Sequence, residues 1–384
     1  MALAPDFMTI AGHLIGFDTT SRNSNLELIA YAEAFLLGAG AHVRLTHDSN
    51  GGKANLFATL GPNINGGYVL SGHTDVVPVD GQDWATNPFH AVMRDDKLFG
   101  RGACDMKGFL AVALSLVPEF ARLNLKRPLH FALSYDEEVG CIGVRGLLDD
   151  LALEGIKPAL AIIGEPTEMK VVGAHKAGAV IETHVKGRDA HSSNPAKGAS
   201  AVMMAGEFIA ALGAIGESLR QDQDEHFDPP YSTLQANMVG GGTAVNVLAR
   251  DALVTWEYRC LPDRDPSRIV ERVVSNAENV ILPKYRSGAP EAGFHHHVHA
   301  SYPGLVRDTN SPAVRLACQL SGANDVHVVA YGTEAGLFQQ SGIPAVVCGP
   351  GSVAQAHREN EFVTQEQLES CTAFLRRVGL AAAS

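Results

Sequence analysis

Apolar and polar positions alternate along the first 178 residues in a way that predicts strands and helices in turn. Five short apolar runs have the length and spacing of strands, at residues 43–45, 55–60, 68–70, 129–135 and 159–163. Longer segments carry apolar residues at helical spacing, at residues 8–15, 25–37, 109–117 and 143–153. Strands that alternate with helices are typical of an α/β domain with a largely parallel sheet.

The periodicity changes after residue 178. Strand-like alternation and helical spacing then follow one another in a β-α-β-β-α order, at residues 179–186, 202–212, 232–239, 253–260 and 267–280. This order predicts a small two-layer α+β domain of ferredoxin-like type. Because the α/β pattern resumes afterwards, we expect a larger domain at 1–178 and 288–384, with the smaller domain inserted at 179–287.

Composition and charge predict a soluble cytoplasmic protein. The chain has 384 residues, 46 % of them apolar and 19 % charged, which suits about two globular domains. Its net charge of −12 argues against nucleic acid or an anionic membrane as a partner, because both attract basic surfaces. The N-terminus lacks the basic segment and apolar core of a signal peptide, and no run approaches the length of a membrane span. The six cysteines contain no CxxC pair and are expected to be reduced thiols.

Histidine and acidic residues follow several of the predicted strands. His73, the acidic pair at 137–138 and Glu165 lie at predicted strand ends, and Asp105 lies at the start of a predicted helix. Because ligands of parallel sheets bind beyond the carboxyl ends of the strands, these side chains are expected to share one edge. Taken singly, His73 is also typical of a solvated loop, Asp105 of a helix N-cap and the acidic pair of a solvated turn.

Together with a histidine near the C-terminus, these residues form a candidate site for two metal ions. The candidate ligands are two imidazoles and three carboxylates, from His73, Asp105, Glu138, Glu165 and His357. Such a set suits a pair of Zn²⁺ ions with one carboxylate between them. Without metal, the converging acids would repel one another and their pKa values would rise. We expect Asp105 to bridge the ions, because a short side chain at a helix start is held rigidly.

Two further acids have predicted roles beside the ligands. Neighbouring residues on a strand point to opposite faces, so Glu137 and Glu138 both reach the site only if the strand has ended before them. In that case Glu138 binds metal and Glu137 is free to act as general base toward an attacking water. Asp75, two residues after His73, is expected to orient the imidazole without binding the metal itself.

The inserted domain has candidate residues of its own. His191 and Asn246 suit hydrogen bonding to a developing oxyanion, and Arg259 at a strand end suits a substrate carboxylate. Each of these residue types is, by itself, also common in purely structural roles. The histidine-rich segment 295–299 is predicted to be a surface loop with no carboxylate beside it.

Seven motifs resemble those of the M20 family of dizinc peptidases and deacylases, namely SGHTDVVPVDGQDW, GRGACDMKG, YDEEVG, GEPT, AHSS, YGTEAGLF and CGPGSVAQAHRENE. The resemblance covers nearly the whole chain. It implies a dizinc exopeptidase-like catalytic domain interrupted by a lid or dimerisation domain, in a homodimer. Two zinc ions, replaceable by Co²⁺, would be bound by His73 with Glu165 and by His357 with Glu138, bridged by Asp105.

The resemblance also implies finer features. The peptide bond after Asp105 would be cis, and Glu137 would be the acid/base residue. Asp75 would contact the metal ligands without binding metal itself. His191 would reach the active site of the partner subunit.

Within the family, residues 331–336 resemble the deacetylase branch rather than the desuccinylases. This resemblance implies an amidohydrolase that removes the acetyl group from N²-acetyl-L-ornithine in arginine synthesis. Thr333 and Glu334 are expected to bind the substrate, with Glu334 favouring a basic amine at its far end. Succinyl-diaminopimelate, another N-acyl amino acid and a dipeptide are the alternative substrates. A non-catalytic binding protein of the same fold is disfavoured, because no ligand or base is missing from the motifs.

Overall fold

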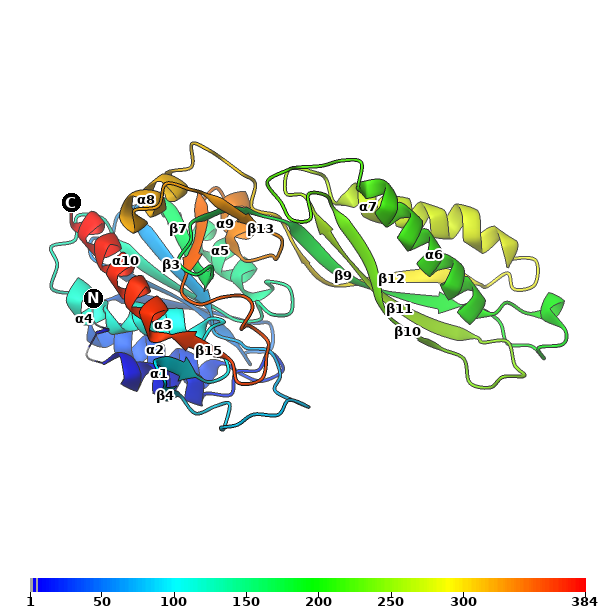
Figure 1. The fold of residues 1–384 in the computed structure, drawn as a ribbon, viewed down its shortest axis with the longest axis horizontal. Helices are drawn as coiled ribbons and strands as arrows, with labels where there is room; N and C mark the ends of the chain where they lie inside the picture. The colour runs from blue at the N-terminus through cyan, green and yellow to red at the C-terminus, as the bar shows by residue number, and fades with distance from the viewer. Residues whose placement is uncertain (1–2, 5) are drawn as a thin grey trace. The chain divides into compact units, whose positions relative to one another are not determined.

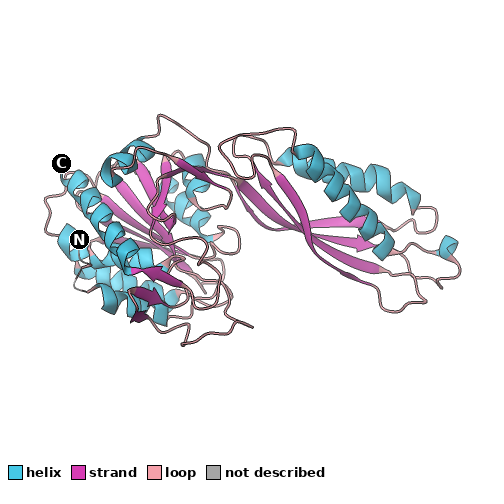
Figure 2. Cartoon of the chain, in the orientation of Figure 1, coloured by secondary structure: helices cyan, strands magenta, loops and turns pink. Residues whose placement is uncertain are grey.

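The computed structural model describes residues 3–4 and 6–384 and divides them into two compact units. The larger unit consists of the chain up to Ala174 together with Leu305–Val328 and Thr333–Ser384. The smaller unit consists of His175–Gly304 and Val329–Gly332. Figure 1 follows the chain through both units, and Figure 2 shows that each contains its own sheet.

The larger unit is built on an eight-stranded sheet with the order β1-β2-β6-β3-β7-β14-β8-β13. The strands are β1 (His42–His47), β2 (Ala54–Leu60), β3 (Tyr68–His73), β6 (Leu129–Ser134), β7 (Leu160–Pro166), β8 (Val172–His175), β13 (His327–Val329) and β14 (Ala345–Gly349). The four central strands, β6, β3, β7 and β14, run parallel to one another. Their carboxyl ends therefore meet at one edge of the sheet.

Helices cover this sheet on both faces (Figure 1). They are α1 (Phe7–Gly16), α2 (Leu26–Gly38), α3 (Lys107–Ser115), α4 (Val117–Phe120), α5 (Gly143–Leu153), α8 (Pro312–Ser321), α9 (Ala335–Gln340) and α10 (Gln365–Ala383). Helix α3 is buried at every position and packs on β3 and β7. Helix α10 begins where the Thr364 side chain accepts a hydrogen bond from the Gln367 backbone. The core of this unit therefore lies between the sheet and these helices.

A second, three-stranded sheet of the larger unit is absent from the sequence prediction. It consists of β4 (Val92–Arg94), β5 (Lys97–Phe99) and β15 (Phe362–Thr364), in the order β15-β5-β4. Each strand has only three residues, which is too short for a periodic signal.

The smaller unit is an antiparallel sheet with helices on one face (Figure 1). Its strands, in sheet order, are β10 (Thr233–Gly241), β11 (Asp251–Cys260), β9 (Ala177–Lys186) and β12 (Gly293–Tyr302). Its helices are α6 (Ala201–Leu219) and α7 (Ser267–Asn276), with short helical turns η1 (Pro195–Lys197), η2 (Ala277–Ile281) and η3 (Leu282–Lys284). Trp256, Phe208 and Phe294 are buried together between the sheet and the helices.

Strand β12 changes two expectations. The segment 295–299 is not a loop as predicted but part of this strand, which pairs antiparallel with β9. Since β12 joins the sheet of the smaller unit, that unit extends to Gly304, beyond the predicted boundary at residue 287. The predicted class, a mostly parallel α/β sheet with a smaller α+β insertion, is confirmed.

Helix α6 passes a test of length and composition for a membrane-spanning helix, although acidic residues interrupt its apolar run. Its 19 residues include Glu207 and Glu217 but are apolar enough on average, and long enough, to cross a membrane by length and composition. Its buried residues, including Met204, Phe208 and Leu212, belong to the core of the smaller unit. Core helices of soluble proteins pass the same test of length and apolarity.

Candidate metal centre

The carboxyl ends of three parallel strands carry most of the predicted ligands. His73 is the last residue of β3, and Glu165 is the next-to-last residue of β7. Strand β6 ends before the acidic pair at 137–138, and the chain turns at Asp136, whose φ is 54°. The acidic pair thus lies in a turn, which allows both of its side chains to reach the same edge.

The Asp105 carboxylate lies between the two histidines. Its Oδ1 atom is 3.0 Å from His73 Nε2, and its Oδ2 atom is 3.4 Å from His357 Nε2. On one side, Glu165 Oε1 is 3.6 Å from His73 Nε2. On the other side, Glu138 Oε2 is 3.0 Å from His357 Nε2. The structure therefore brings all five predicted ligands together.

These separations fit the coordination of two metal ions. Two ligand atoms at zinc bonding distance, in a tetrahedral arrangement, lie roughly 3.3 Å apart. The four nitrogen–oxygen distances of the site range from 3.0 to 3.6 Å. Asp105 offers a different oxygen to each histidine, which suits a carboxylate that bridges two ions through both of its oxygens. The residues of this site would hold one ion between His73 and Glu165 and the other between His357 and Glu138.

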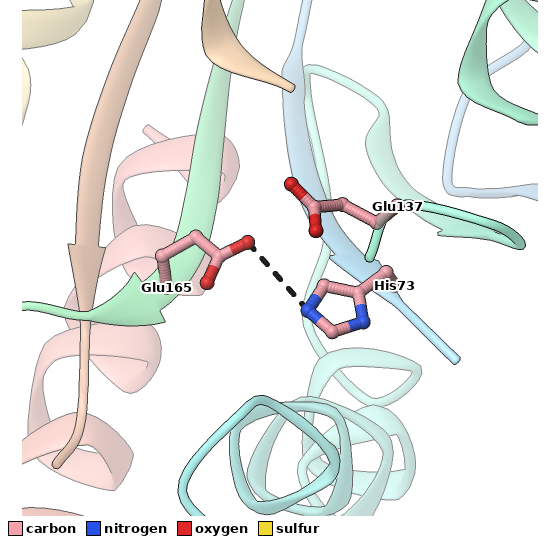
Figure 3. A group of neighbouring side chains, drawn as sticks. All are labelled: His73, Glu137 and Glu165. Atoms are coloured by element: carbon pink, nitrogen blue, oxygen red, sulfur yellow. Dashed lines mark ion pairs between the residues drawn. The ribbon is translucent and has the colours of Figure 1, made fainter. Parts of the chain in front are cut away.

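Glu137 lies beside the first of these positions. Figure 3 shows Glu137, Glu165 and His73 converging from three segments of the chain. One ligand atom from each of these residues lies within 4.8 Å of the other two. The Cys141 thiol donates a hydrogen bond to Glu137 Oε1 at 3.3 Å. Glu137 is thus within reach of a molecule bound between His73 and Glu165, which is where a general base is needed.

The electrostatics of the cluster favour bound cations. Burial, reinforced by the Asp105 charge, raises the pKa of Glu138 to about 7 and the pKa of Glu165 well above its usual value. Burial also raises the pKa of Glu137 well above its usual value. Burial alone would raise the pKa of Asp105, but hydrogen bonds from the two imidazoles hold it below its usual range. Buried carboxylates that repel one another in this way are stabilised by a divalent cation.

Asp75 supports the site mainly through the acidic turn. Its carboxylate oxygens accept hydrogen bonds from the backbone N–H groups of Glu137 at 3.1 Å and Glu138 at 3.2 Å. The Ser21 hydroxyl donates to the same carboxylate at 2.7 Å. His73 Nδ1 instead pairs with the Asp75 backbone carbonyl at 2.9 Å, while the carboxylate lies 3.6 Å away. The backbone of Asp75 therefore orients the imidazole, and its side chain fixes the turn that carries the acidic pair.

A buried ion pair holds the loop that carries Asp105. Arg101 and Glu361 are each 1 % exposed, and Arg101 Nη1 lies 2.8 Å from Glu361 Oε2. The same carboxylate accepts backbone hydrogen bonds from Gly102 at 3.0 Å, Cys104 at 2.8 Å and Asp105 at 3.0 Å. Glu361 thereby ties the Asp105 loop to the segment that carries His357. The peptide bond after Asp105 is cis, as the family resemblance implies.

Sequence reasoning did not assign a role to Arg101 or Glu361. Glu361 follows the polar residues 358–360, which are typical of a solvated loop. The available signal was that both residues stand inside the quoted motifs, GRGACDMKG and CGPGSVAQAHRENE.

Glu334 is buried without a hydrogen-bond partner of good geometry among the described residues. Its side chain is 1 % exposed, and both carboxylate oxygens lack a partner. The buried hydroxyls of Ser71 and Ser134 also lack partners and are close enough to Glu334 to lower its pKa. Burial outweighs them and raises that pKa to about 7. The neighbouring Thr333 is fully buried, and its Oγ1 accepts a hydrogen bond from the Ala335 backbone at 3.1 Å.

The remaining predicted residues belong to the smaller unit. His191 and Asn246 lie on adjoining loops. His191 forms an isolated antiparallel β-bridge with Val247, and the Ser192 N–H donates to the Asn246 backbone carbonyl at 3.0 Å. Both side chains are exposed. Arg259 lies on β11, where its guanidinium donates to Tyr302 and pairs with Glu257 at 3.1 Å.

Comparisons with known proteins identify the family to which this chain is similar. The model of peptidase family M20/M25/M40 matches residues 69–380. Acetylornithine deacetylase from Myxococcus xanthus is 35 % identical, over 95 % of this chain and 94 % of that protein. Acetylornithine deacetylase from Pasteurella multocida is 30 % identical, over 98 % of each chain.

Solved structures share the fold. A metallo-carboxypeptidase of the M20 family from Sulfolobus solfataricus has a TM-score of 0.78 at 18 % identity, over 98 % of this chain and 99 % of that one. A dinuclear metal-binding peptidase of the same family from Bacillus subtilis has a TM-score of 0.67 at 17 % identity, over 98 % and 97 %.

Proposed function

The chain belongs to peptidase family M20/M25/M40 and is therefore a hydrolase, and we propose that it is a two-metal amide hydrolase. Its proposed reaction removes the acetyl group from N²-acetyl-L-ornithine and yields L-ornithine and acetate. The observation that carries this proposal is the Asp105 carboxylate, whose two oxygens reach His73 and His357 separately. The choice of substrate is supported by the two acetylornithine deacetylases at 35 % and 30 % identity.

The proposed mechanism assigns proton transfer to Glu137. Hydrolysis adds water oxygen to the acetyl carbonyl carbon and breaks the bond from that carbon to the amide nitrogen. When bound, two divalent ions would polarise the carbonyl and lower the pKa of the attacking water. Glu137 takes the proton that the water loses and returns it to the leaving amine. Asp75 contributes by holding the turn that carries Glu137 through the backbone hydrogen bond at 3.1 Å.

Four residues are proposed to bind the substrate. Glu334 would pair with the amine at the far end of ornithine, because a buried carboxyl without a partner is stabilised when a cation joins it. Thr333, next to it, would line the same pocket. Arg259 would hold the α-carboxylate, and Asn246 would hydrogen-bond the developing oxyanion.

The wider assignments follow from the family resemblance. We propose that the ions are Zn²⁺, replaceable by Co²⁺, and that the enzyme is a cytoplasmic homodimer joined through the smaller unit. In this dimer His191 would stabilise the oxyanion in the partner's active site. The free state of all six cysteines is in keeping with a reducing compartment. The product would enter arginine synthesis.

A kinetic comparison tests the reaction and the substrate together. We expect kcat/KM to favour N²-acetyl-L-ornithine over N-succinyl-diaminopimelate by about a hundredfold or more, near 2.7 kcal/mol in the transition state. Chelation should abolish turnover, and returned zinc should restore it. Zinc-dependent turnover that favours the succinyl substrate would move the protein to the other branch, and turnover that survives complete metal removal would overturn the mechanism.

Two neighbouring glutamates provide a matched test of the proton transfer. Glu137→Gln should lower kcat by roughly 10²- to 10⁴-fold while the bound metal is retained. Glu138→Gln should lose metal as well as activity. The roles are misassigned if Glu137→Gln loses metal to the same extent as Glu138→Gln.

The substrate and dimer proposals have separate tests. Glu334→Gln should lose preference for acetylornithine over acetylleucine, and an unchanged preference would refute the assignment of Glu334. Mixing His191→Ala with Glu137→Gln subunits should restore activity if the two residues serve one site from different chains. Verified heterodimers without restored activity would refute the contribution of His191 to the partner's site.

A further inference from the structure

The sheet of the smaller unit carries a row of histidines that the proposed reaction does not use. Strand β12, an edge strand beside β9 (Figure 1), holds His295, His297 and His299. All three side chains are exposed. His296 lies on the other side, where it pairs with Thr183 at 2.8 Å and packs against Phe208 of α6. The other three therefore form an exposed histidine row, which we define as His295, His297 and His299.

A local irregularity brings two members of the row together. Alternation along a strand places His295 and His297 on the same side. The register between β12 and β9 shifts between Val298 and Ala300, so His299 lies in a bulge. Its ring is 4.8 Å from that of His297, at an angle of 84°. His297 and His299 are therefore neighbours at the bulge.

A carboxylate from the adjacent strand lies beside the row. Glu182 of β9 stands directly opposite His297 in the sheet. Its Oε2 atom is 3.4 Å from His299 Nε2. This distance resembles the roughly 3.3 Å that separates two ligands of one tetrahedral zinc ion. The carboxylate that the sequence prediction found missing beside this segment is therefore supplied by β9.

From this cluster we infer a peripheral binding site for a zinc ion, formed by His297, His299 and Glu182. Two imidazoles and one glutamate are a known ligand set for zinc, with water as the fourth ligand. The ligand pair at this spacing in the structure is His299 with Glu182, whose side chains are 45 % and 34 % exposed. His297 is also exposed, so all three side chains can turn toward a common ion at little packing cost. The site shares no residue with the metal centre of the larger unit, and it is independent of the proposed reaction.

Outer partners support the same face. His184 of β9 stands opposite His295, and their rings stack at 6.1 Å. His184 Nε2 also lies 3.0 Å from Asp251 Oδ1. Asp251 adds a second carboxylate to this face, which favours the approach of a divalent cation.

Zinc counting on the untagged, metal-loaded protein tests the inference. At micromolar free zinc in equilibrium dialysis, the unaltered protein should bind one zinc per chain more than His297→Ala. His299→Ala and Glu182→Gln should weaken this extra zinc by about tenfold or more. The matched control is His226→Ala, which removes another exposed, acid-paired histidine of the smaller unit and should keep the extra zinc. In all four variants kcat/KM should be unchanged.

Two results would overturn the site. One is equal zinc binding by the unaltered protein and by His297→Ala. The other is loss of the extra zinc in the His226→Ala control, which would indicate non-specific binding to surface histidines. Because the readout is a difference between variants, it is unaffected by which substrate the enzyme cleaves and by how many ions the larger unit binds.

Discussion

Replacement of Glu361 by glutamine tests how the Asp105 loop is held. The Oε2 atom of Glu361 serves Arg101 and the Gly102 N–H, and its Oε1 atom serves the N–H groups of Cys104 and Asp105. Glutamine has nearly the same shape, but only one of its two terminal atoms accepts hydrogen bonds. In either orientation of the amide, two buried donors therefore face an NH₂ group.

The expected cost follows from these contacts. Hydrogen bonds to a charged group contribute about 1.5–3 kcal/mol each, and two are lost. The Arg101 side chain, 1 % exposed, is also left without its counter-charge, and breaking a buried pair from one side costs about 3–5 kcal/mol. These contributions overlap, so we expect Glu361→Gln to reduce the free energy of unfolding by roughly 3–5 kcal/mol. Because the loop carries Asp105, zinc affinity should fall by about tenfold or more.

Both quantities are measurable on the same preparations. Urea unfolding of the metal-free protein gives the stability change without the contribution of bound ions, and chelator competition gives the zinc affinity. The matched control is Glu359→Gln, whose exposed carboxylate accepts one backbone hydrogen bond from Asp83 at 2.9 Å, and its cost should stay within about 0.5 kcal/mol. If Glu361→Gln behaves like this control in stability and in zinc affinity, Glu361 does not position Asp105.

Three further predictions concern pH, packing and metal. Burial lowers the pKa of His130 to about 4, from 6.5 in an exposed histidine. The unfolded chain therefore binds a proton between pH 6.5 and 4 that the folded chain does not. Between pH 7 and pH 4.5 the free energy of unfolding should therefore fall by about 2–3 kcal/mol less in His130→Gln than in the unaltered protein. An equal fall in both proteins would contradict this. A Cβ at Gly164 would lie 2.2 Å from the Phe109 ring, so Gly164→Ala should cost roughly 1–3 kcal/mol in urea unfolding. Gly213→Ala on α6, where the added carbon meets nothing within 4 Å, should be neutral or stabilising, and a similar loss in both would refute the steric argument. Chelation should lower the unfolding free energy by about 4 kcal/mol when free zinc is near a thousand times its Kd. Asp105→Asn should remove most of this response, and a response of the same size in that variant would contradict its bridging role.

Local patterns determined much of the fold, because helices and buried strands repeat their apolar residues within a few positions. The runs at 129–135 and 159–163 predict β6 (Leu129–Ser134) and β7 (Leu160–Pro166) closely. Once strands alternate with helices in a parallel sheet, the residues after each strand must meet at one edge. This is why the sequence alone brought His73, Glu138 and Glu165 into one candidate site.

Strands that depend on a distant partner were not predictable in this way. The β15 strand has three residues and is a strand because Phe362–Thr364 pairs with Lys97–Phe99 of β5. The segment 295–299 has no alternating apolar pattern, so it is a strand only because β9 lies beside it. The pairing partner in both cases is far away in the chain, where periodicity carries no information.

The supporting contacts of the metal centre were decided by tertiary structure for the same reason. The sequence identifies Asp75 as an acid near His73, but only the fold shows that its carboxylate binds the turn at 137–138. In the sequence, Glu361 is likewise only one more charged residue. Its hydrogen-bond partners lie more than 250 positions earlier in the chain. Hydrogen bonds and charge pairs depend on distances in space, and a sequence specifies the donors and acceptors without specifying which of them meet.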